Sequence, residues 1–339
     1  MIEPWPWRAS SEPARTSVAP RVGQRKNWAA RKTLRVGQSH LAVAQITDDG
    51  QFAFVISELD VNLRLFQISN GLKLAQTPLP DLKTFEAFDA TLWPAANNDC
   101  PAREICVLLG TLEGLTLLNA RTGAAVQKVS AVGADHLRFS TDKLLLGAAL
   151  SEIPAQKSEL VIYRLDAVAA PLTPVLLASF AERVDDWALS ASRKLLAVIY
   201  YPSNRVEVID LSTQQSLFSV PAPKYAHSLD FSGDEKLLAV GGEKLELIRV
   251  DAPLLSVSFE HYANNIHQVR FNSITDQWFT SSYDGKIRIF KAEGEAPSLK
   301  LVQTLSHTGT ANVYALSFTA DGQELLSSSG DQTLKLWKY

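Results

Sequence analysis

The sequence predicts an all-β protein built from repeated strand segments. The clearest segment is the last one, residues 313–339, which reads as three short strands joined by two turns. An Asp-Gly pair in residues 319–322 suits a tight reversal, and residues 333–337 alternate polar and apolar side chains with period two. No window reads as a long amphipathic helix or as an apolar run of about 18 residues, so we expect no membrane-spanning helix.

Weaker copies of the first strand and its polar turn recur upstream. A degenerate copy that ends at Ala90 fits an interval of about twice the usual length. The seven aligned strand ends are Ile46, Ala90, Phe139, Leu189, Phe231, Phe271 and Phe318. Their spacing lies close to the roughly 40 to 45 residues of a repeat that forms one four-stranded sheet.

The last segment resembles the WD-repeat family. Its strand order, the S-x-D-x-T sequence at residues 329–333 and the final Trp337 carry this resemblance. The resemblance implies a seven-bladed β-propeller formed by residues 30–339 as a single domain. The last repeat supplies only three strands, so residues 30–36 are expected to complete that blade and close the ring. Removal of residues 1–36 is then expected to destabilise the protein.

The resemblance also assigns a structural role to polar residues of the last repeat. In the family, a His, a Ser or Thr, an Asp and a Trp form a hydrogen-bonded chain. The matching residues here are His307, Ser327 or Ser329, Asp331 and Trp337. A Ser-His-Asp set could also suggest a nucleophilic triad, but that would need an exposed nucleophile and an oxyanion site.

The sixth repeat is expected to keep part of this network. Its matching residues are His261, Ser281 or Ser282, Asp284 and Phe290, and phenylalanine has no N–H to donate. Earlier repeats are expected to have lost more of it, including Glu58-Leu-Asp60 in the first.

The first 29 residues are predicted to form a basic, proline-rich tail with little fixed structure. Residues 1–35 hold 8 of the 33 Lys and Arg but 2 of the 36 Asp and Glu, which leaves 25 basic and 34 acidic residues elsewhere. The tail could bind an acidic partner, nucleic acid or an anionic membrane, with Trp5, Trp7 and Trp28 as anchors. The simpler interpretation, which we favour, is a solvated extension that merges into the closing strand. A transit peptide is a third alternative, against which Glu3 and Glu12 argue. The acidic body argues against nucleic-acid binding outside the tail.

The two cysteines, Cys100 and Cys106, leave the compartment open. A disulfide between them would favour export, whereas two free thiols would suit the cytoplasm, which we expect, with the periplasm as the alternative. A zinc site is not expected, because no His or second Cys pair lies nearby.

The fourth repeat differs from the others. Residues 198–215, VIYYPSNRVEVIDLSTQQ, are similar to the YVTN class of bacterial propellers. This similarity covers one repeat and favours a bacterial source.

Partner binding is expected at the face where the innermost strands begin, because loops from all blades converge there. In the family, the residue after the first apolar position of each inner strand lies near this entrance. These residues are Ala42, Glu86, Asp135, Asp185, His227, His267 and Tyr314. Three acids opposite His and Tyr would favour a peptide with Lys or Arg, and Tyr314 would be an anchor. Alternatively, these are simply the polar residues that any channel mouth needs.

Two function classes follow. The first is a non-catalytic scaffold for a protein or peptide partner, without a cofactor. The second is a YVTN-like or lactonase-like enzyme or ligand-binding protein, with acids and His at the central funnel. The scaffold is favoured because the sequence has no P-loop, zinc-protease or nucleophile-elbow motif. A metal bridged by Asp185, His227 and His267 is a further alternative.

Overall fold

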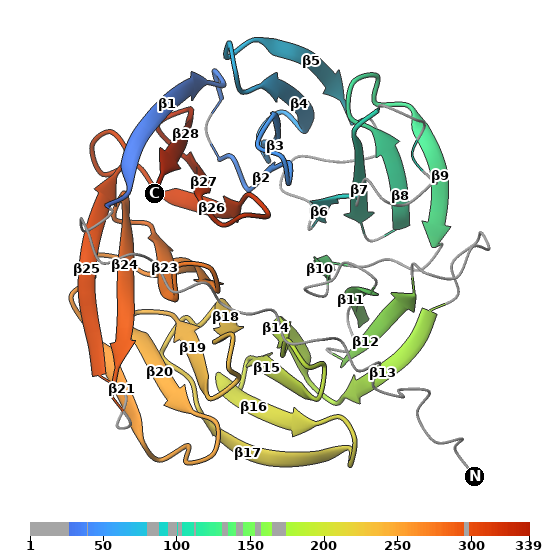
Figure 1. The fold of residues 1–339 in the computed structure, drawn as a ribbon. Helices are drawn as coiled ribbons and strands as arrows, with labels where there is room; N and C mark the ends of the chain where they lie inside the picture. Colours follow the sequence, from blue (N-terminus) through green and yellow to red (C-terminus); the bar gives the residue numbers. More distant parts are fainter. Residues whose placement is uncertain are drawn as a thin grey trace.

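Seven four-stranded antiparallel sheets form a ring in the computed structural model (Figure 1). The structure describes residues 27–38, 40–79, 88–93, 100, 104–111, 113–130, 135–139, 145–152, 157–164, 174–294 and 298–339. These residues contain strands and turns but no helix, and so no helix that could cross a membrane. The predicted all-β architecture is confirmed.

Each sheet is one blade, and in six of the seven the strands run in sequence order from the centre of the ring outward (Figure 1). The first three blades are β2 (Val43–Ile46), β3 (Phe52–Ile56), β4 (Asn62–Gln67) and β5 (Lys73–Pro78); β6 (Phe88–Leu92), β7 (Cys106–Thr111), β8 (Gly114–Asn119) and β9 (Ala125–Ser130); β10 (Asp135–Phe139), β11 (Leu145–Glu152), β12 (Lys157–Arg164) and β13 (Pro174–Phe180). The next three are β14 (Arg183–Leu189), β15 (Leu195–Tyr201), β16 (Arg205–Asp210) and β17 (Gln215–Pro221); β18 (Ser228–Phe231), β19 (Leu237–Gly241), β20 (Leu245–Arg249) and β21 (Ser256–Phe259); β22 (Ile266–Asn272), β23 (Gln277–Ser282), β24 (Lys286–Glu293) and β25 (Ser298–Ser306).

The seventh blade combines the two ends of the chain. It consists of β26 (Val313–Phe318), β27 (Glu324–Ser329), β28 (Thr333–Lys338) and, outermost, β1 (Ala29–Arg35). β1 pairs antiparallel with β28, with Leu34 opposite Leu334 and Ala29 opposite Lys338. The edge of β28 is therefore covered by β1, which removes an exposed edge that could pair with another chain.

Trp28 belongs to this closure and not to a tail, which corrects the sequence-based boundary. Its side chain is 3% exposed and packs 5.2 Å from the Phe279 ring, centroid to centroid. Its indole Nε1 donates to Gln277 Oε1 at 3.3 Å, and its backbone N donates to Gln303 Oε1 at 2.9 Å. The rest of the predicted tail, residues 1–26 with Trp5 and Trp7, lies outside the described residues.

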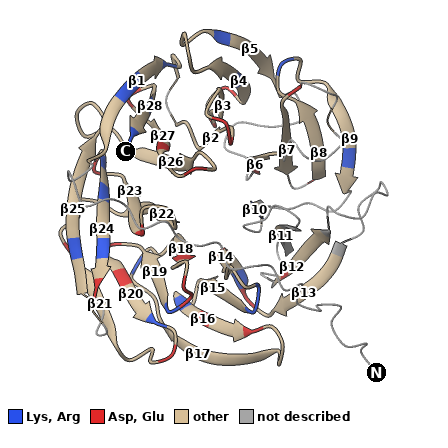
Figure 2. Cartoon of the chain, in the orientation of Figure 1, with Lys and Arg blue, Asp and Glu red and all other residues tan. Residues whose placement is uncertain are grey.

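Lysines and arginines lie along several outer strands, including β1, β5, β9 and β25 (Figure 2). Those on β1 make structural contacts: Arg31 pairs with Glu324, and Lys32 Nζ donates to the Ile68 carbonyl at 2.8 Å. Part of the basic charge that sequence analysis assigned to the N-terminal region therefore stabilises the ring closure.

Several of the described turns that follow inner strands use a recurring short motif. In the last blade, Thr319 Oγ1 donates to Asp321 Oδ1 at 2.6 Å, and the Gly322 N–H donates to the Thr319 carbonyl at 2.9 Å. Gly322 has φ of +62°, a left-handed conformation that glycine adopts without strain. Thr47 and Asp49 make the same bond at 2.6 Å in the first blade. These contacts explain the polar turn pattern in the sequence.

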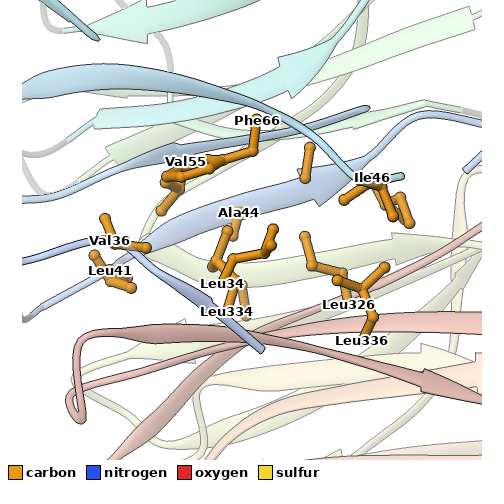
Figure 3. Close-up of a cluster of buried hydrophobic side chains, with 13 residues drawn as sticks. Leu34, Val36, Leu41, Ala44, Ile46, Val55, Phe66, Leu326, Leu334 and Leu336 are labelled. Atoms are coloured by element: carbon orange, nitrogen blue, oxygen red, sulfur yellow. The ribbon is translucent and has the colours of Figure 1, made fainter. Parts of the chain in front are cut away.

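The hydrophobic core lies between neighbouring blades. Between the last and first blades, Leu34, Leu334 and Leu336 face residues of β2 to β4, such as Ile46 and Phe66 (Figure 3). Every one of these side chains is at most 3% exposed. Alternating strand residues reach one interface or the other, so stability depends on complete closure of the ring.

Ser328 joins the last blade to the first. Its Oγ donates to the Leu41 carbonyl at 2.8 Å and accepts the Ala315 N–H at 3.0 Å. We expect Ser328→Ala to lower the free energy of unfolding by about 1–3 kcal/mol, because it leaves buried backbone groups unpaired. Urea denaturation would measure this, with the exposed Ser258→Ala as a control; equal stabilities would contradict the bridging role.

Candidate functional site

The inner strands β2, β6, β10, β14, β18, β22 and β26 begin on one face of the ring, which we call the entrance face. Five of the predicted partner-binding residues lie at or beside the starts of described inner strands: Asp135, Asp185, His227, His267 and Tyr314. Of these, Asp135 is described through its backbone only, and Glu86 lies outside the described residues.

Asp185 and His227 form a pair across the fourth and fifth blades. Asp185 Oδ2 lies 2.8 Å from His227 Nδ1, and Arg183 lies 3.9 Å from Asp185 Oδ1. Burial acts to raise the pKa of Asp185, but the hydrogen bond and charge of His227 outweigh it and hold that pKa below its usual value. Asp185 is therefore an anion at neutral pH.

Two exposed tyrosines lie beside this pair. Tyr201 ends β15 and is 51% exposed, and Tyr225, in the loop before β18, is 62% exposed. The Arg183 guanidinium lies 5.6 Å from the centre of the Tyr201 ring. We call Arg183, Asp185, Tyr201, Tyr225 and His227 the tyrosine patch. Sequence analysis missed both tyrosines because it considered inner strands alone, although the patch also uses the adjoining loops.

His267 and Tyr314 belong to a second group of rings, on the sixth and seventh blades. His267 Nδ1 lies 2.9 Å from the Tyr283 hydroxyl, and its ring centroid lies 5.6 Å from that of Tyr314. Burial, followed by the positive charges of His227 and Arg270, lowers the pKa of His267 to about 4, so the ring is neutral at pH 7. Tyr314 is 8% exposed, because the surrounding rings cover most of it, and its role as an anchor stays a prediction.

The structure does not bring all three residues of the alternative metal site, Asp185, His227 and His267, together. Asp185 bonds to His227, whereas His267 bonds to Tyr283. Over the part of the chain that is described, no group of three or more His, Cys, Asp or Glu has a geometry suited to a metal ion.

A ring of polar side chains joins each inner strand to the next blade. At six of the seven junctions, a side-chain oxygen accepts a backbone N–H of the following inner strand. Examples are Asp89 Oδ2 with Leu137 N at 2.7 Å and Gln268 Oε1 with Leu316 N at 2.6 Å. We call these residues the inner collar: Gln45, Asp89, Arg138, Asp186, Asp230, Gln268 and Ser317.

The junction between the third and fourth blades is the exception. There Arg138 makes two hydrogen bonds to Asp186, at 3.0 and 2.7 Å, and Asp186 in turn accepts the Leu229 N–H of the fifth blade at 3.0 Å. Burial works to lower the pKa of Arg138, but the surrounding carboxylates raise it overall. Sequence analysis missed the collar, although its signal is present as a polar residue near the end of most inner strands. These acids stabilise the ring and are occupied by backbone amides.

The predicted network of the last blade forms a continuous chain. Trp337 Nε1 donates to Ser327 Oγ at 2.9 Å, Ser327 Oγ lies 2.7 Å from His307 Nε2, and His307 Nδ1 lies 3.3 Å from Asp331. Ser327, and not Ser329, is thus the serine of this network. It is 0% exposed, so its hydroxyl cannot meet a substrate as a nucleophile would.

The sixth blade uses different residues from those predicted. His261 is exposed, and the neighbouring Tyr262 donates to or accepts from Thr280 Oγ1 at 2.8 Å. The Arg288 guanidinium lies 4.3 Å from the Tyr262 ring centre and bonds to Asp284 at 2.7 Å. The predicted Ser281 and Ser282 instead bond to backbone carbonyls. A cation–π and ion-pair arrangement therefore replaces the His-Ser-Trp chain.

The first blade repeats this ion pair. Arg64, which is 2% exposed, pairs with Asp60 four residues earlier, the spacing of Asp284 and Arg288. Asp60, which sequence analysis counted among the lost positions, thus keeps a structural role. The two cysteines, whose state the sequence left open, form a disulfide between Cys100 and Cys106.

The ring of four-stranded sheets and the hydrogen-bonded network of the last blade are together typical of a WD-type β-propeller. The comparisons with known proteins agree with this. The family model for the WD domain, G-beta repeat, matches residues 299–338. WD repeat-containing protein 1 of Mus musculus is 26% identical over 163 residues, 47% of this chain and 27% of that protein. U3 small nucleolar RNA-associated protein 12 of Saccharomyces cerevisiae is 25% identical over 167 residues, 45% of this chain and 17% of that protein. WD repeat-containing protein 1 of Gallus gallus is 23% identical over 249 residues, 72% of this chain and 39% of that protein.

The chain is similar to WD-repeat proteins, and its last repeat matches the family model. It spans between 17% and 39% of the length of these three relatives. The relatives are eukaryotic, so the comparisons do not support the bacterial source that the fourth repeat suggested. The similarity of that repeat to the YVTN class stays a prediction.

Proposed function

We propose that the protein is a non-catalytic scaffold that binds a protein or peptide partner on its entrance face, through the tyrosine patch. The observation that carries this proposal is the exposure of Tyr201 and Tyr225, 51% and 62%. Tyr201 lies against Arg183, which is 3.9 Å from Asp185, and Tyr225 lies two positions before His227. Tyrosine is enriched among residues that dominate binding energy, because it buries a large ring and keeps a polar hydroxyl.

The backbone supports the same conclusion. Tyr225 has φ of 56°, a left-handed conformation that is uncommon for a bulky residue. The Lys224 carbonyl, next to it, accepts the Glu243 N–H at 2.8 Å, which fixes the loop. A strained residue that holds a large ring in solvent suggests a functional role for that ring.

The tyrosine patch carries both positive and negative side chains, so it suits a partner that also carries charges of both signs. Asp185 and the Arg183 guanidinium lie within 3.9 Å of each other, and the side chain of His227 is 44% exposed. Exposed charges of this kind affect the rate and selectivity of association more than its final affinity. The predicted preference for a basic peptide belongs to this proposal, as does a second contact through the basic N-terminal residues.

We expect Tyr201→Ser with Tyr225→Ser to weaken partner binding by about 10- to 100-fold, since each tyrosine is taken as a residue worth more than 1 kcal/mol. Partners captured by the wild-type protein would be identified by mass spectrometry, purified and titrated calorimetrically against both proteins. The control is Leu217→Ser with Leu254→Ser, which are 49% and 93% exposed and lie outside the patch. Equal binding by the tyrosine variant and this control would refute the site.

The enzyme or small-ligand alternative requires a reactive group on the entrance face. Of the acids and histidines predicted there, Asp185 bonds to His227 and His267 bonds to Tyr283, and the Ser-His-Asp set of the last blade is buried. These pairings favour the scaffold.

The compartment is a separate proposal. The Cys100–Cys106 disulfide favours an oxidising compartment over the cytoplasm that was expected from the sequence. Alkylation of the protein purified from its native cells, followed by mass spectrometry, tests this; two alkylated cysteines would indicate a reducing compartment.

A further inference from the structure

A group of rings and one carboxylate lies on the entrance face, across the first, sixth and seventh blades. His40 and Glu58 flank strands of the first blade, Tyr283 follows β23, and His267 and Tyr314 are the second residues of β22 and β26. We call these five residues the ring cluster. It is separate from the tyrosine patch, which lies on the fourth and fifth blades.

The rings are packed closely enough to act together. The centroid of Tyr314 lies 6.1 Å from that of Tyr283 and 5.9 Å from that of His40. The Tyr283 and Tyr314 planes meet at 70°, and His267 lies 5.2 Å from Tyr283. Tyr314 is mostly covered, whereas Tyr283 is partly exposed and His40 is exposed. The group thus has a buried part and an accessible part.

Glu58 provides a carboxylate to this cluster; the charge of His40 acts to lower its pKa, but burial outweighs that effect and raises the pKa. Its carboxylate has no hydrogen-bond or ion-pair partner among the described residues, although the side chain is partly buried. The charge of Glu58 also acts on the rings. The pKa of Tyr283 is raised to about 12 by burial first, then by the charge of Tyr314 and then by the charge of Glu58. A partly buried carboxylate without a partner costs stability, so a ligand that supplies the missing positive charge would be favoured.

The rings suit the same ligand. Faces of tyrosine attract ammonium and guanidinium groups within about 6 Å, and the attraction is stronger where water is excluded. His267 is neutral at pH 7, so it does not repel a cation.

We propose that the ring cluster binds the cationic side chain of a lysine or arginine in the partner, with Glu58 as the counter-charge and Tyr283 as a ring wall. This proposal rests on the scaffold function and names a chemical feature of its partner. It needs no contact with the tyrosine patch, so the two sites can fail independently.

The test uses four acetylated, amidated pentapeptides of alanine whose central residue is lysine, trimethyllysine, arginine or norleucine. Saturation-transfer NMR titrations with the full chain would give their relative affinities. We expect at least one cationic peptide to bind about tenfold more tightly than the norleucine peptide. Equal binding of all four would overturn the proposal, whereas partner capture through Tyr201 and Tyr225 would be unaffected by that result.

Variants of the full chain then test which residues of the ring cluster bind the cation. Glu58→Gln and Tyr283→Leu should each reduce cation binding to the norleucine level, and Tyr283→Phe, which keeps the ring, should retain it. Glu260→Gln removes an exposed acid of 70% side-chain exposure elsewhere and controls for net charge. Unchanged cation binding by Glu58→Gln would overturn the role of the carboxylate.

Thermal unfolding shows whether a variant that loses cation binding has simply lost stability. Glu58→Gln should unfold at or above the wild-type temperature, because burial raises the pKa of Glu58 and the variant removes a poorly solvated charge. A lower unfolding temperature would show that Glu58 is a structural residue with a stabilising partner, which contradicts the proposal.

Discussion

Replacement of Trp28 with alanine is expected to lower the free energy of unfolding by about 3–5 kcal/mol, the usual cost of removing a large buried ring. The indole packs against Phe279 and Tyr339, with ring centroids 5.2 and 5.4 Å away, and hydrogen-bonds to Gln277. These contacts connect the first described residues to the sixth blade and to the last residue of the chain. Chemical denaturation of the purified protein, followed by fluorescence or circular dichroism, would measure the loss.

Two matched variants separate packing from other effects of the substitution. Trp28→Phe keeps a ring but loses the N–H, so it should cost less than alanine. Thr33→Ala changes an exposed residue of β1, the strand that directly follows Trp28, and should alter stability by less than about 0.5 kcal/mol. If Trp28→Ala were as stable as Thr33→Ala, the backbone pairing of β1 with β28 alone would be sufficient for closure. Removal of residues 1–36 would also expose the edge of β28, and we expect that chain to aggregate as it unfolds.

The last blade could be predicted in detail because its polar residues stand at fixed positions in a distinctive strand pattern. Strand periodicity and the Asp-Gly turn located β26 and β27, and the positions of His307, Asp331 and Trp337 indicated the network. Each of these signals is local, so the sequence contains it within about 30 residues.

The contacts between blades could not be predicted in the same way. Trp28 meets Phe279 across 251 positions of the chain, and the collar residue Asp186 bonds to Leu229 of the next blade. The polarity of Asp186 is visible in the sequence, but its partner is a backbone amide whose availability depends on how neighbouring inner strands are staggered. The structural role of the collar acids Asp89, Asp186 and Asp230 therefore became visible only in the geometry.

The sixth blade shows a second reason why contacts could not be predicted from the sequence. Its sequence contains a His, two Ser and an Asp, yet the blade uses Tyr262, Thr280 and Arg288 with Asp284. Because Phe290 cannot donate a hydrogen bond, a serine-centred chain would lack its last donor. The arginine supplies donors to the same aspartate, so the blade keeps the Asp while the remaining partners change.

The stability of the protein is expected to fall as the pH drops from 6.5 toward 4, and His307 should cause a large part of this fall. Burial, opposed in part by the charge of Asp331, lowers the pKa of His307 from 6.5 to about 4. Between these values the unfolded chain binds a proton that the folded protein does not, so the free energy of unfolding rises with pH across this window. The difference in pKa corresponds to roughly 3 kcal/mol for one such residue.

Urea titrations at pH 7 and pH 4.5 would test this with His307→Gln. That variant should be less stable than the wild type at pH 7, because the network loses its ring, but it should lose about 2–3 kcal/mol less on acidification. His261→Gln, whose parent ring is exposed, serves as the control and should keep the wild-type pH dependence. His267 also has a pKa of about 4, so part of the acid sensitivity should persist in His307→Gln.

The hydrogen-bond directions explain why the neutral ring is required. Trp337 donates to Ser327 Oγ, which leaves the serine hydroxyl hydrogen free to be donated to His307 Nε2, while His307 Nδ1–H points to Asp331. A protonated imidazole would place an N–H at Nε2, where the serine hydrogen already lies, and would add a charge in a side chain that is 0% exposed. Protonation therefore reverses the Ser327–His307 bond and leaves the buried serine hydrogen without its acceptor. Equal acid sensitivity of the wild type and His307→Gln would show that this bond does not carry the effect.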